Sequence, residues 1–338
     1  MGPLTERAPI DFVVTWVDGG DPAWQAQRAA YAPGPGADDR PERYRDWGLL
    51  RYWFRGVEAC APWARQVHFV TDCPPPAWLD TAHPKLHVVS TADFMPPQCL
   101  PTFNSNALEV YLHRIPGLAE QFVYFNDDTY LLRPAAPEDF FRQGKPRDML
   151  ALQPVVANPA SPVMSRILLN DSLVLCRHFD KRTNMRRHWR QYFHLGLPPR
   201  YFIYNLLELA FPLYTGFYTV HGPSPMLRST YEELWAAEPE ILEETGRHRF
   251  REGTDVTQYL FREWQKQKGD FTPANLHRDF AYLGLEHPEQ AAREIRRRRR
   301  KMICANDTPA VRDFDAARRE LQQAFESVFP QPSSFEKE

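Results

Sequence analysis

Three side chains with oxygen ligands follow one short apolar run in this chain. The run spans residues 122–125, and Asn126, Asp127 and Asp128 come directly after it. Consecutive apolar, β-branched and aromatic residues predict a short buried strand, and ligands of open α/β sheets bind beyond the carboxyl ends of the strands. Because hard divalent cations prefer oxygen ligands, the pattern indicates a cation site that would neutralise the diphosphate of a nucleotide donor. The alternative is a turn that caps a helix.

Two single residues later in the chain have types and positions that suit phosphate chemistry. His221 ends a predicted strand, 215–220, and stands before a Gly/Pro turn, where an imidazole is a candidate base or a structural group. Arg251 comes just before a helix predicted over 256–268, a position that suits bidentate contact with phosphate. A late predicted strand, 302–307, ends in Asn-Asp and repeats the form of residues 125–127.

A predicted helix start adds a further anion site. Residues 101–106 are polar and lead into a helix predicted over 107–114, with Asn104 or Ser105 as its N-cap. The free N–H groups of that helix end could bind a phosphate.

The first predicted strand, 10–17, is broken by a Gly/Asp/Pro turn that begins at Asp18. This turn has neither the GxGxxG nor the Walker spacing, which excludes a dinucleotide site and a P-loop. Trp16 could stack on a base, and Asp18 could contact a ribose hydroxyl or a metal. From local sequence alone, a core tryptophan and a turn aspartate are favoured.

The remaining elements of the first half form a strand–helix–strand rhythm. A helix is predicted over 47–59 and strands over 66–71, which ends at Asp72, and 86–89. This order predicts an α/β fold with a Rossmann-like, mainly parallel sheet flanked by helices. Residues 31–41 are rich in Pro, Gly and Asp and predict a loop, and residues 133–147 predict an irregular charged loop.

The second half has more helical character. A helix is predicted over 166–191, a buried apolar helix over 200–212 and a closing amphipathic helix over 313–329. The first of these has a basic cluster that could receive an anionic acceptor or be a solvated face. With no repeat or linker, the chain predicts a single catalytic domain, 8–330, with a nucleotide-binding half (8–150), a helical acceptor-side insertion (160–212) and a catalytic C-terminal part (213–330).

Composition restricts the class and location of the protein. The net charge of the 338 residues is −2 at pH 7, so no global field recruits nucleic acid. The five scattered cysteines predict reduced thiols. Residues 1–9 have no apolar core and predict no signal peptide, and no apolar window of about 20 residues predicts a membrane span. We expect a cytoplasmic protein, with peripheral contact at the inner face of the membrane as an alternative, in which the Arg296–Arg300 run would touch anionic lipid or glycan.

Taken together, these stretches resemble the Stealth family. Its bacterial members are capsular polysaccharide hexose-1-phosphate transferases, and its animal relative is the catalytic chain of the lysosomal-enzyme GlcNAc-1-phosphotransferase. Four regions of the family have matches in order: 10–22, 45–128, 221–255 and 303–307. The third match is looser, because family members often have Ala or Met where Gly222 stands.

The resemblance implies a GT-A-like fold and a UDP-sugar donor, UDP-GlcNAc or a related UDP-hexose. It implies transfer of sugar-1-phosphate to a hydroxyl of a glycan or glycolipid acceptor, with release of UMP and help from Mg²⁺ or Mn²⁺. By position, the nucleotide would be held by Thr15, Trp16, Val17, Asp18 and Asp72. Asn104 and Ser105 would approach the sugar or phosphates, and the metal would be bound or flanked by Asp127, Asp128 and Asp307. His221 and Arg251 match residues that look catalytic in the family, with Asp128 as the other candidate base.

Two rival functions stay open from sequence. An ordinary glycosyltransferase would use the same donor and metal but attack the sugar carbon and release UDP. A binding module for nucleic acid or anionic glycan would use the Arg clusters and show strongly salt-dependent binding. Carboxylates at several strand ends disfavour a polyanion binder, because it gains nothing from buried acids.

Overall fold

The computed structural model describes residues 8–31 and 37–337. The N-terminal segment 1–9 and the predicted loop 31–41 therefore lie partly outside the described residues. Within the described chain, no helix is long and apolar enough to cross a bilayer. All five cysteines are free thiols, as expected.

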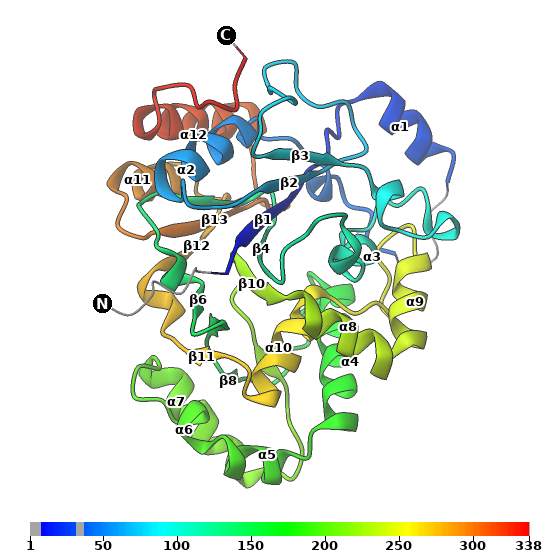
Figure 1. Ribbon diagram of the computed structural model, residues 1–338, viewed down its shortest axis with the longest axis vertical. Helices are drawn as coiled ribbons and strands as arrows, with labels where there is room; N and C mark the ends of the chain where they lie inside the picture. Colours follow the sequence, from blue (N-terminus) through cyan, green and yellow to red (C-terminus); the bar gives the residue numbers. More distant parts are fainter. Residues whose placement is uncertain (1–7, 32–36, 338) are drawn as a thin grey trace.

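A five-stranded sheet lies at the centre of the molecule (Figure 1), in the order β10-β4-β1-β2-β3. Strand β1 pairs in parallel with β2 and β4, β2 pairs in parallel with β3, and only β10 is antiparallel. The predicted mainly parallel sheet is confirmed. The strands are β1 (Ile10–Thr15), β2 (Val67–Val70), β3 (Leu86–Val89), β4 (Gln121–Phe125) and β10 (Ser224–Leu227).

Alternate residues of these strands face two separate cores. In β1, Phe12 and Val14 belong to one core and Val13 to the other, because successive side chains of a strand point to opposite faces. Both faces are therefore apolar, which a buried parallel sheet requires. Helices α2 (Leu50–Cys60) and α12 (Phe314–Val328) cover the first face, and the second is covered by α3 (Ser105–Glu109), α8 (Arg228–Ala237), α9 (Pro239–Arg247) and α10 (Gln258–Lys268).

A second, three-stranded sheet begins where β4 ends. Its order is β12-β13-β5, formed by β5 (Thr129–Leu131), β12 (Phe280–Gly284) and β13 (Met302–Asn306). Strand β13 is antiparallel to β5 and parallel to β12. Only residues 126–128 separate β4 from β5, so the Asn-Asp-Asp turn joins the two sheets. Helix α11 (Pro288–Arg297) packs with α12 over this second sheet.

The predicted helical insertion is present, but its helices differ from the expectation. It lies between β8 (Ala151–Leu152) and β9 (Phe217–Tyr218), which pair with each other. The helix predicted over 166–191 begins earlier, at Pro162, and is three helices, because Asp180 caps a new one with its side chain. The insertion contains α4 (Pro162–His178), α5 (Lys181–Arg187), α6 (Trp189–Tyr192) and α7 (Pro199–Leu207).

Three local predictions are wrong. Residues 133–147 are not irregular, because β6 (Phe141–Arg142) and β7 (Lys145–Asp148) form a hairpin whose turn residues Gln143 and Gly144 have positive φ. The strand predicted over 215–220 is reduced to β9, and the Pro-containing turn after it becomes β10, which tolerates Pro225 as an edge strand. The helix predicted over 200–212 is not buried, since its outer face is exposed.

The other predicted elements have observed counterparts. Those over 10–17, 47–59, 66–71, 86–89, 256–268, 302–307 and 313–329 appear within a few residues of the expected bounds, and the helix predicted over 107–114 shortens to α3. The described chain also contains α1 (Pro22–Ala29), which follows the Asp18 turn, and β11 (Thr272–Pro273), which pairs with β7.

A buried ion pair connects helix α10 to strand β7 beside His221. Arg262 of α10 donates from Nε and Nη2 to the two carboxylate oxygens of Asp148 in β7, each at 2.9 Å. Its Nη1 donates to the Val220 carbonyl at 2.8 Å and to Ser224 Oγ at 3.1 Å. Both charged side chains are 1% exposed. The guanidinium therefore holds the backbone carbonyl just before His221 and the Ser224 side chain three residues after it.

We predict that Arg262→Met lowers the free energy of unfolding by about 3–5 kcal/mol, because it leaves the Asp148 carboxylate buried and unpaired. Urea denaturation followed by circular dichroism measures the loss. The double variant Arg262→Met/Asp148→Leu is the matched control and should lose clearly less than the single variant. A single-variant loss below about 1 kcal/mol would contradict the assigned role of this pair.

Candidate active site

A cleft of about 630 Å³ opens at the carboxyl ends of β1, β2 and β4. Asp18 faces a neighbouring hollow instead, where its Oδ1 accepts a hydrogen bond from Gly20 N at 2.8 Å. The cleft brings together all the other site residues predicted from sequence: Thr15, Trp16, Val17, Asp72, Asn104, Ser105, Asp127, Asp128, His221, Arg251 and Asp307.

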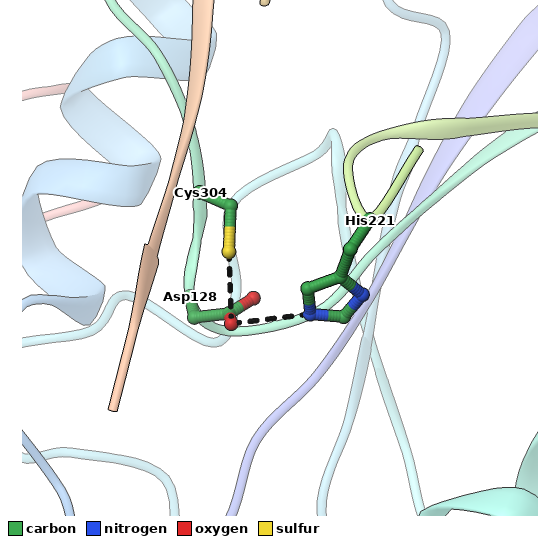
Figure 2. A group of neighbouring side chains, drawn as sticks. All are labelled: Asp128, His221 and Cys304. Atoms are coloured by element: carbon green, nitrogen blue, oxygen red, sulfur yellow. Dashed lines mark hydrogen bonds and ion pairs between the residues drawn. The ribbon is translucent and has the colours of Figure 1, made fainter. Parts of the chain in front are cut away.

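The turn between β4 and β5 forms an acidic corner, which we define as Asn126, Asp127 and Asp128. Asp128 Oδ2 accepts a hydrogen bond from Cys304 Sγ at 3.1 Å and lies 3.3 Å from His221 Nε2 (Figure 2). Among the described residues, neither Asp128 Oδ1 nor Asn126 Oδ1 has a hydrogen-bond partner, and both atoms are buried. Buried acceptors without partners are costly, so these two oxygens point to a ligand from outside the chain.

The electrostatics of the acidic corner favour a cation as that ligand. Desolvation, followed by the negative charges of Asp128 and Asp46, raises the pKa of Asp127 to about 7, although its side chain is open to the solvent in the cleft. A divalent cation would relieve this repulsion, and carboxylate and amide oxygens are the donors that Mg²⁺ and Mn²⁺ accept. The residues of the corner therefore fit the expected metal.

A softer metal site on the other side of Asp128 is less suitable. Ligand atoms of Asp128, His221 and Cys304 lie within 4.8 Å of one another. Burial and the charge of Asp128 raise the pKa of Cys304 well above its usual value. The thiol therefore stays protonated and donates a hydrogen bond to Asp128. Because cysteine binds metals as the thiolate, these three groups fit a hydrogen-bonded cluster better than a metal centre.

His221 is held by contacts at both ring nitrogens. Its Nδ1 shares a hydrogen bond of 2.6 Å with the Tyr259 hydroxyl, and its Nε2 faces Asp128. Burial favours the neutral ring, but the charge of Asp128 outweighs it and raises the pKa of His221. The turn after it is closely packed in this chain, since a Cβ on Gly222 would lie 2.5 Å from the Phe280 ring. The imidazole is thus oriented and prepared to take up a proton.

Arg251 brings an unpaired positive charge to the same cleft. Its Nη2 donates to Ser105 Oγ at 2.7 Å, and no carboxylate in the described chain forms an ion pair with it. Arg40 and Arg43 stand nearby and share Asp38, whose backbone N–H donates to the Arg251 carbonyl at 2.8 Å. Burial, with the charge of Arg251 next, lowers the pKa of Arg43 to about 10. This basic wall, Arg40, Arg43 and Arg251, has more positive charge than its one aspartate offsets.

Two of the predicted ligand-binding side chains are used by the fold itself. Asn104 caps α3 through Oδ1, and its Nδ2 donates to Asp255 Oδ2 at 2.9 Å and to the Phe250 carbonyl, which braces the loop of Arg251. Asp72 accepts from Ser90 Oγ and Thr91 N, each at 2.8 Å, and from Thr91 Oγ1 at 2.5 Å. Both residues line the cleft, but their polar atoms already have partners.

Asp307 and Trp16 both line the cleft, but only the side-chain polar atoms of Asp307 already have hydrogen-bond partners in the described chain. Both oxygens of Asp307 accept from Arg45, at 2.7 and 2.8 Å, and Trp47 Nε1 donates to the same carboxylate. A bond from Asp307 to a metal would therefore compete with Arg45. Trp16 packs against Phe69, with ring centroids 5.8 Å apart, and its buried Nε1 has no partner in the described chain. Thr15 is tied to Tyr124 by a hydrogen bond of 3.1 Å.

Sequence reasoning missed several residues in or beside the cleft that the fold makes important. Glu109 lies one helical turn after Ser105, accepts from the Tyr124 hydroxyl at 3.0 Å, and has a pKa raised by burial. The i, i+4 spacing to Ser105 could have identified it. Cys304 shares a strand face with Asn306, a period-two signal. Nothing in the local pattern identifies Tyr259.

Comparisons with known proteins identify the family of this chain. Three family models match: Stealth protein conserved region 1 over residues 8–35, conserved region 2 over 43–148 and conserved region 4 over 293–338. The capsular polysaccharide phosphotransferase WcwK of Streptococcus pneumoniae is 34% identical over 97% of this chain and 98% of its own. The receptor polysaccharide phosphotransferase WefC of Streptococcus oralis is 36% identical over 97% of this chain and 99% of its own.

A solved structure, the apo form of mouse xyloside xylosyltransferase 1, overlaps 88% of this chain and 98% of its own at 9% identity and a TM-score of 0.36. A likeness at that level supports no argument about function. The identity to WcwK and WefC extends over nearly the whole chain, and the matched regions contain β1, the acidic corner and Asp307. This chain belongs to the Stealth family and is a phosphotransferase.

Proposed function

We propose that this phosphotransferase moves a sugar-1-phosphate, GlcNAc-1-phosphate in the first instance, from a UDP-sugar to a hydroxyl of a glycan or glycolipid acceptor and releases UMP. Its relatives include proteins named as capsular, receptor and exopolysaccharide phosphotransferases. Polysaccharide is thus the acceptor class they support. The observation that carries the proposal is that one cleft contains both the acidic corner, with two unpartnered oxygens, and the unpaired Arg251.

This combination of charges suits a pyrophosphate linkage. The acidic corner by itself would repel a diphosphate, so Asn126, Asp127 and Asp128 are the residues that would hold Mg²⁺ or Mn²⁺. Such an ion supplies charge neutralisation at the phosphate oxygens. The basic wall would bind the same linkage directly, with Arg251 contacting phosphate in the fork geometry that guanidinium groups favour. Phosphoryl transfer depends mainly on positioning and on stabilising charge.

His221 is the residue we propose as the base. It would take the proton of the acceptor hydroxyl as the oxygen attacks the phosphorus next to the sugar. Asp128 would stabilise the imidazolium that forms, and Tyr259 would orient the ring. Asp128 is the less suitable base because one of its oxygens already accepts from Cys304, and the other, which has no partner in the described chain, is one of the oxygens that would hold the metal. The bond between the bridging oxygen and that phosphorus breaks, and UMP leaves.

The nucleotide product tests this function against an ordinary glycosyltransferase. We expect UDP-GlcNAc, Mg²⁺ and a polysaccharide acceptor to give UMP and a product that retains phosphate, because attack occurs at phosphorus. Ion-exchange chromatography identifies the nucleotide. The His221→Ala variant, expected to be slower by about 100-fold or more, controls for contaminating enzymes. UDP as the first product, with phosphate absent from the glycan, would establish the glycosyltransferase instead.

We predict that Arg251→Met lowers kcat/KM by about 100-fold or more, since it removes a cation that stabilises charge on the transferred phosphoryl group. Steady-state kinetics measure this effect. Ser105→Ala is the matched control because it removes only the hydroxyl that positions the guanidinium, and it should cost about ten-fold or less. If both variants retain wild-type rates while their melting temperatures are unchanged, Arg251 does not contact the reacting phosphate.

We predict that Asn126→Ala weakens Mn²⁺ binding by about ten-fold or more, because it removes a buried oxygen with no partner in the protein. Isothermal titration calorimetry measures the affinity without substrate. Asp307→Asn is the comparison, and its effect should be smaller because Arg45 already engages both oxygens of Asp307. The reverse order of effects would move the metal site from the acidic corner towards Asp307.

A further inference from the structure

An apolar surface lies open at the far end of the helical insertion. Figure 1 shows α5, α6 and α7 gathered at one end of the molecule, away from the central sheet. Monomeric proteins rarely leave large contiguous apolar patches open without a function. We call this surface the insertion tip and define it by side chains that are 49–94% exposed: Trp189, Leu195, Ile203, Leu206, Leu207, Leu209, Phe211 and Leu213.

Helix α7 directs its polar side into the protein and its apolar side outward. Asn205 is fully buried, where its Oδ1 accepts from Leu152 N at 2.7 Å and its Nδ2 donates to the Tyr192 carbonyl at 2.6 Å. On the opposite face, Ile203 and Leu207 are 53% and 58% exposed. A helix on an aqueous surface has the reverse arrangement. The outward face of α7 is therefore suited to an apolar environment.

The segment after α7 is held firmly in its exposed position. Lys181 Nζ donates to Glu208 Oε2 at 2.5 Å, and to the carbonyls of Glu208, Phe211 and Leu213 at 2.7, 3.3 and 2.9 Å. Both charged side chains are at most 3% exposed. Burying an ion pair is costly, and this pair fixes the backbone from which Leu209, Phe211 and Leu213 project. Their exposure is a property of the fold.

The segment that carries the insertion tip also has a strong positive charge. Residues 177–213 contain seven Arg or Lys and only two acids. Both acids are engaged, since Glu208 pairs with Lys181 and Asp180 caps α5 by accepting from Thr183 N at 2.9 Å. Four exposed arginines of α5 and α6 form no ion pair within the described chain: Arg182, Arg186, Arg187 and Arg190.

The exposed apolar side chains and the unpaired arginines together favour an anionic bilayer as the partner. A second copy of this chain in a two-fold contact would place the same arginines against one another, whereas anionic headgroups would neutralise them. Apolar side chains flanked by arginine and by an exposed tryptophan are typical of helices that lie in the membrane interface. Helix α7 has nine residues, too few to span a bilayer. We propose that the insertion tip docks the protein onto a membrane containing anionic lipid.

Docking at the tip would also set the position of the cleft. Helix α4 starts at the cleft, which Ser161 and Met164 line, and leads directly to α5. Its 17 residues extend about 25 Å at the helical rise. This distance would place the catalytic groups above the headgroups. If the proposed function holds, they would then be within reach of a glycan carried by a lipid in the same membrane.

Flotation with phosphatidylcholine vesicles, with and without one-third phosphatidylglycerol, tests the proposal on the full chain. We expect binding to the anionic vesicles and at least about ten-fold weaker binding to the neutral ones. Ile203→Asp/Leu207→Asp and Arg182→Glu/Arg186→Glu should each weaken binding to the anionic vesicles by about ten-fold or more. These side chains are exposed, so melting temperatures should stay near that of the parent protein.

Val156→Asp is the matched control, because Val156 is 63% exposed but lies outside the insertion tip, and it should bind as the parent does. Equal binding to both kinds of vesicle, no binding to either, or tip variants that bind like the parent would overturn the proposal. Analytical ultracentrifugation addresses the rival occupant. A dimer that the Ile203→Asp/Leu207→Asp variant dissociates would make the tip a contact between copies of the chain. The vesicle assays need no turnover, so they can fail independently of the catalytic proposal.

Discussion

The short turn that joins two sheets is the constraint on which the rest of the site depends. Residues 126–128 leave the central sheet at β4 and enter the second sheet at β5, so neither end of the turn is free to move. The Asp128 carbonyl accepts from Ala305 N at 2.8 Å, which pins the turn to β13. Two like charges are thereby held close together, and the protein keeps them there because both sheets determine the backbone.

The positively charged side of the cleft is also held in place, but by hydrogen bonds from loops and helices rather than by a turn between sheets. The loop of Arg251 is braced by Asn104 and Asp255, and its backbone pairs with Asp38. His221 is fixed from behind by Arg262, whose guanidinium bonds to the carbonyl of the preceding residue. Buried polar networks therefore surround the cleft, while Asn126, Asp128 and Arg251, which face it, are left incompletely paired in the described chain. Such an arrangement spends stability on positioning, and pre-organised charge is what phosphoryl transfer requires.

In the helical insertion, too, buried polar groups fix the position of side chains that are left without partners in the described chain, here on the surface. Lys181 and Glu208 are buried together so that a run of apolar side chains can remain outside. Cleft and insertion tip are connected by one helix, α4, which makes their relative position a fixed property of the fold. The active-site cleft and the proposed membrane contact are thus linked through a single helix.

The sequence by itself determined the central strands, the covering helices α2 and α12, and the family, because period-two and helical patterns are local and the Stealth motifs are contiguous. It also identified Asp127, Asp128, His221 and Arg251 as candidates. It missed the β6–β7 hairpin, since Gln-Gly is a weak turn signal, and β10, since Pro225 suggests a turn. Only the tertiary structure decided that Asp307 pairs with Arg45, 262 residues away in sequence, and that Asn104 braces a loop. Such pairings are set by packing between distant segments, and no local pattern encodes them.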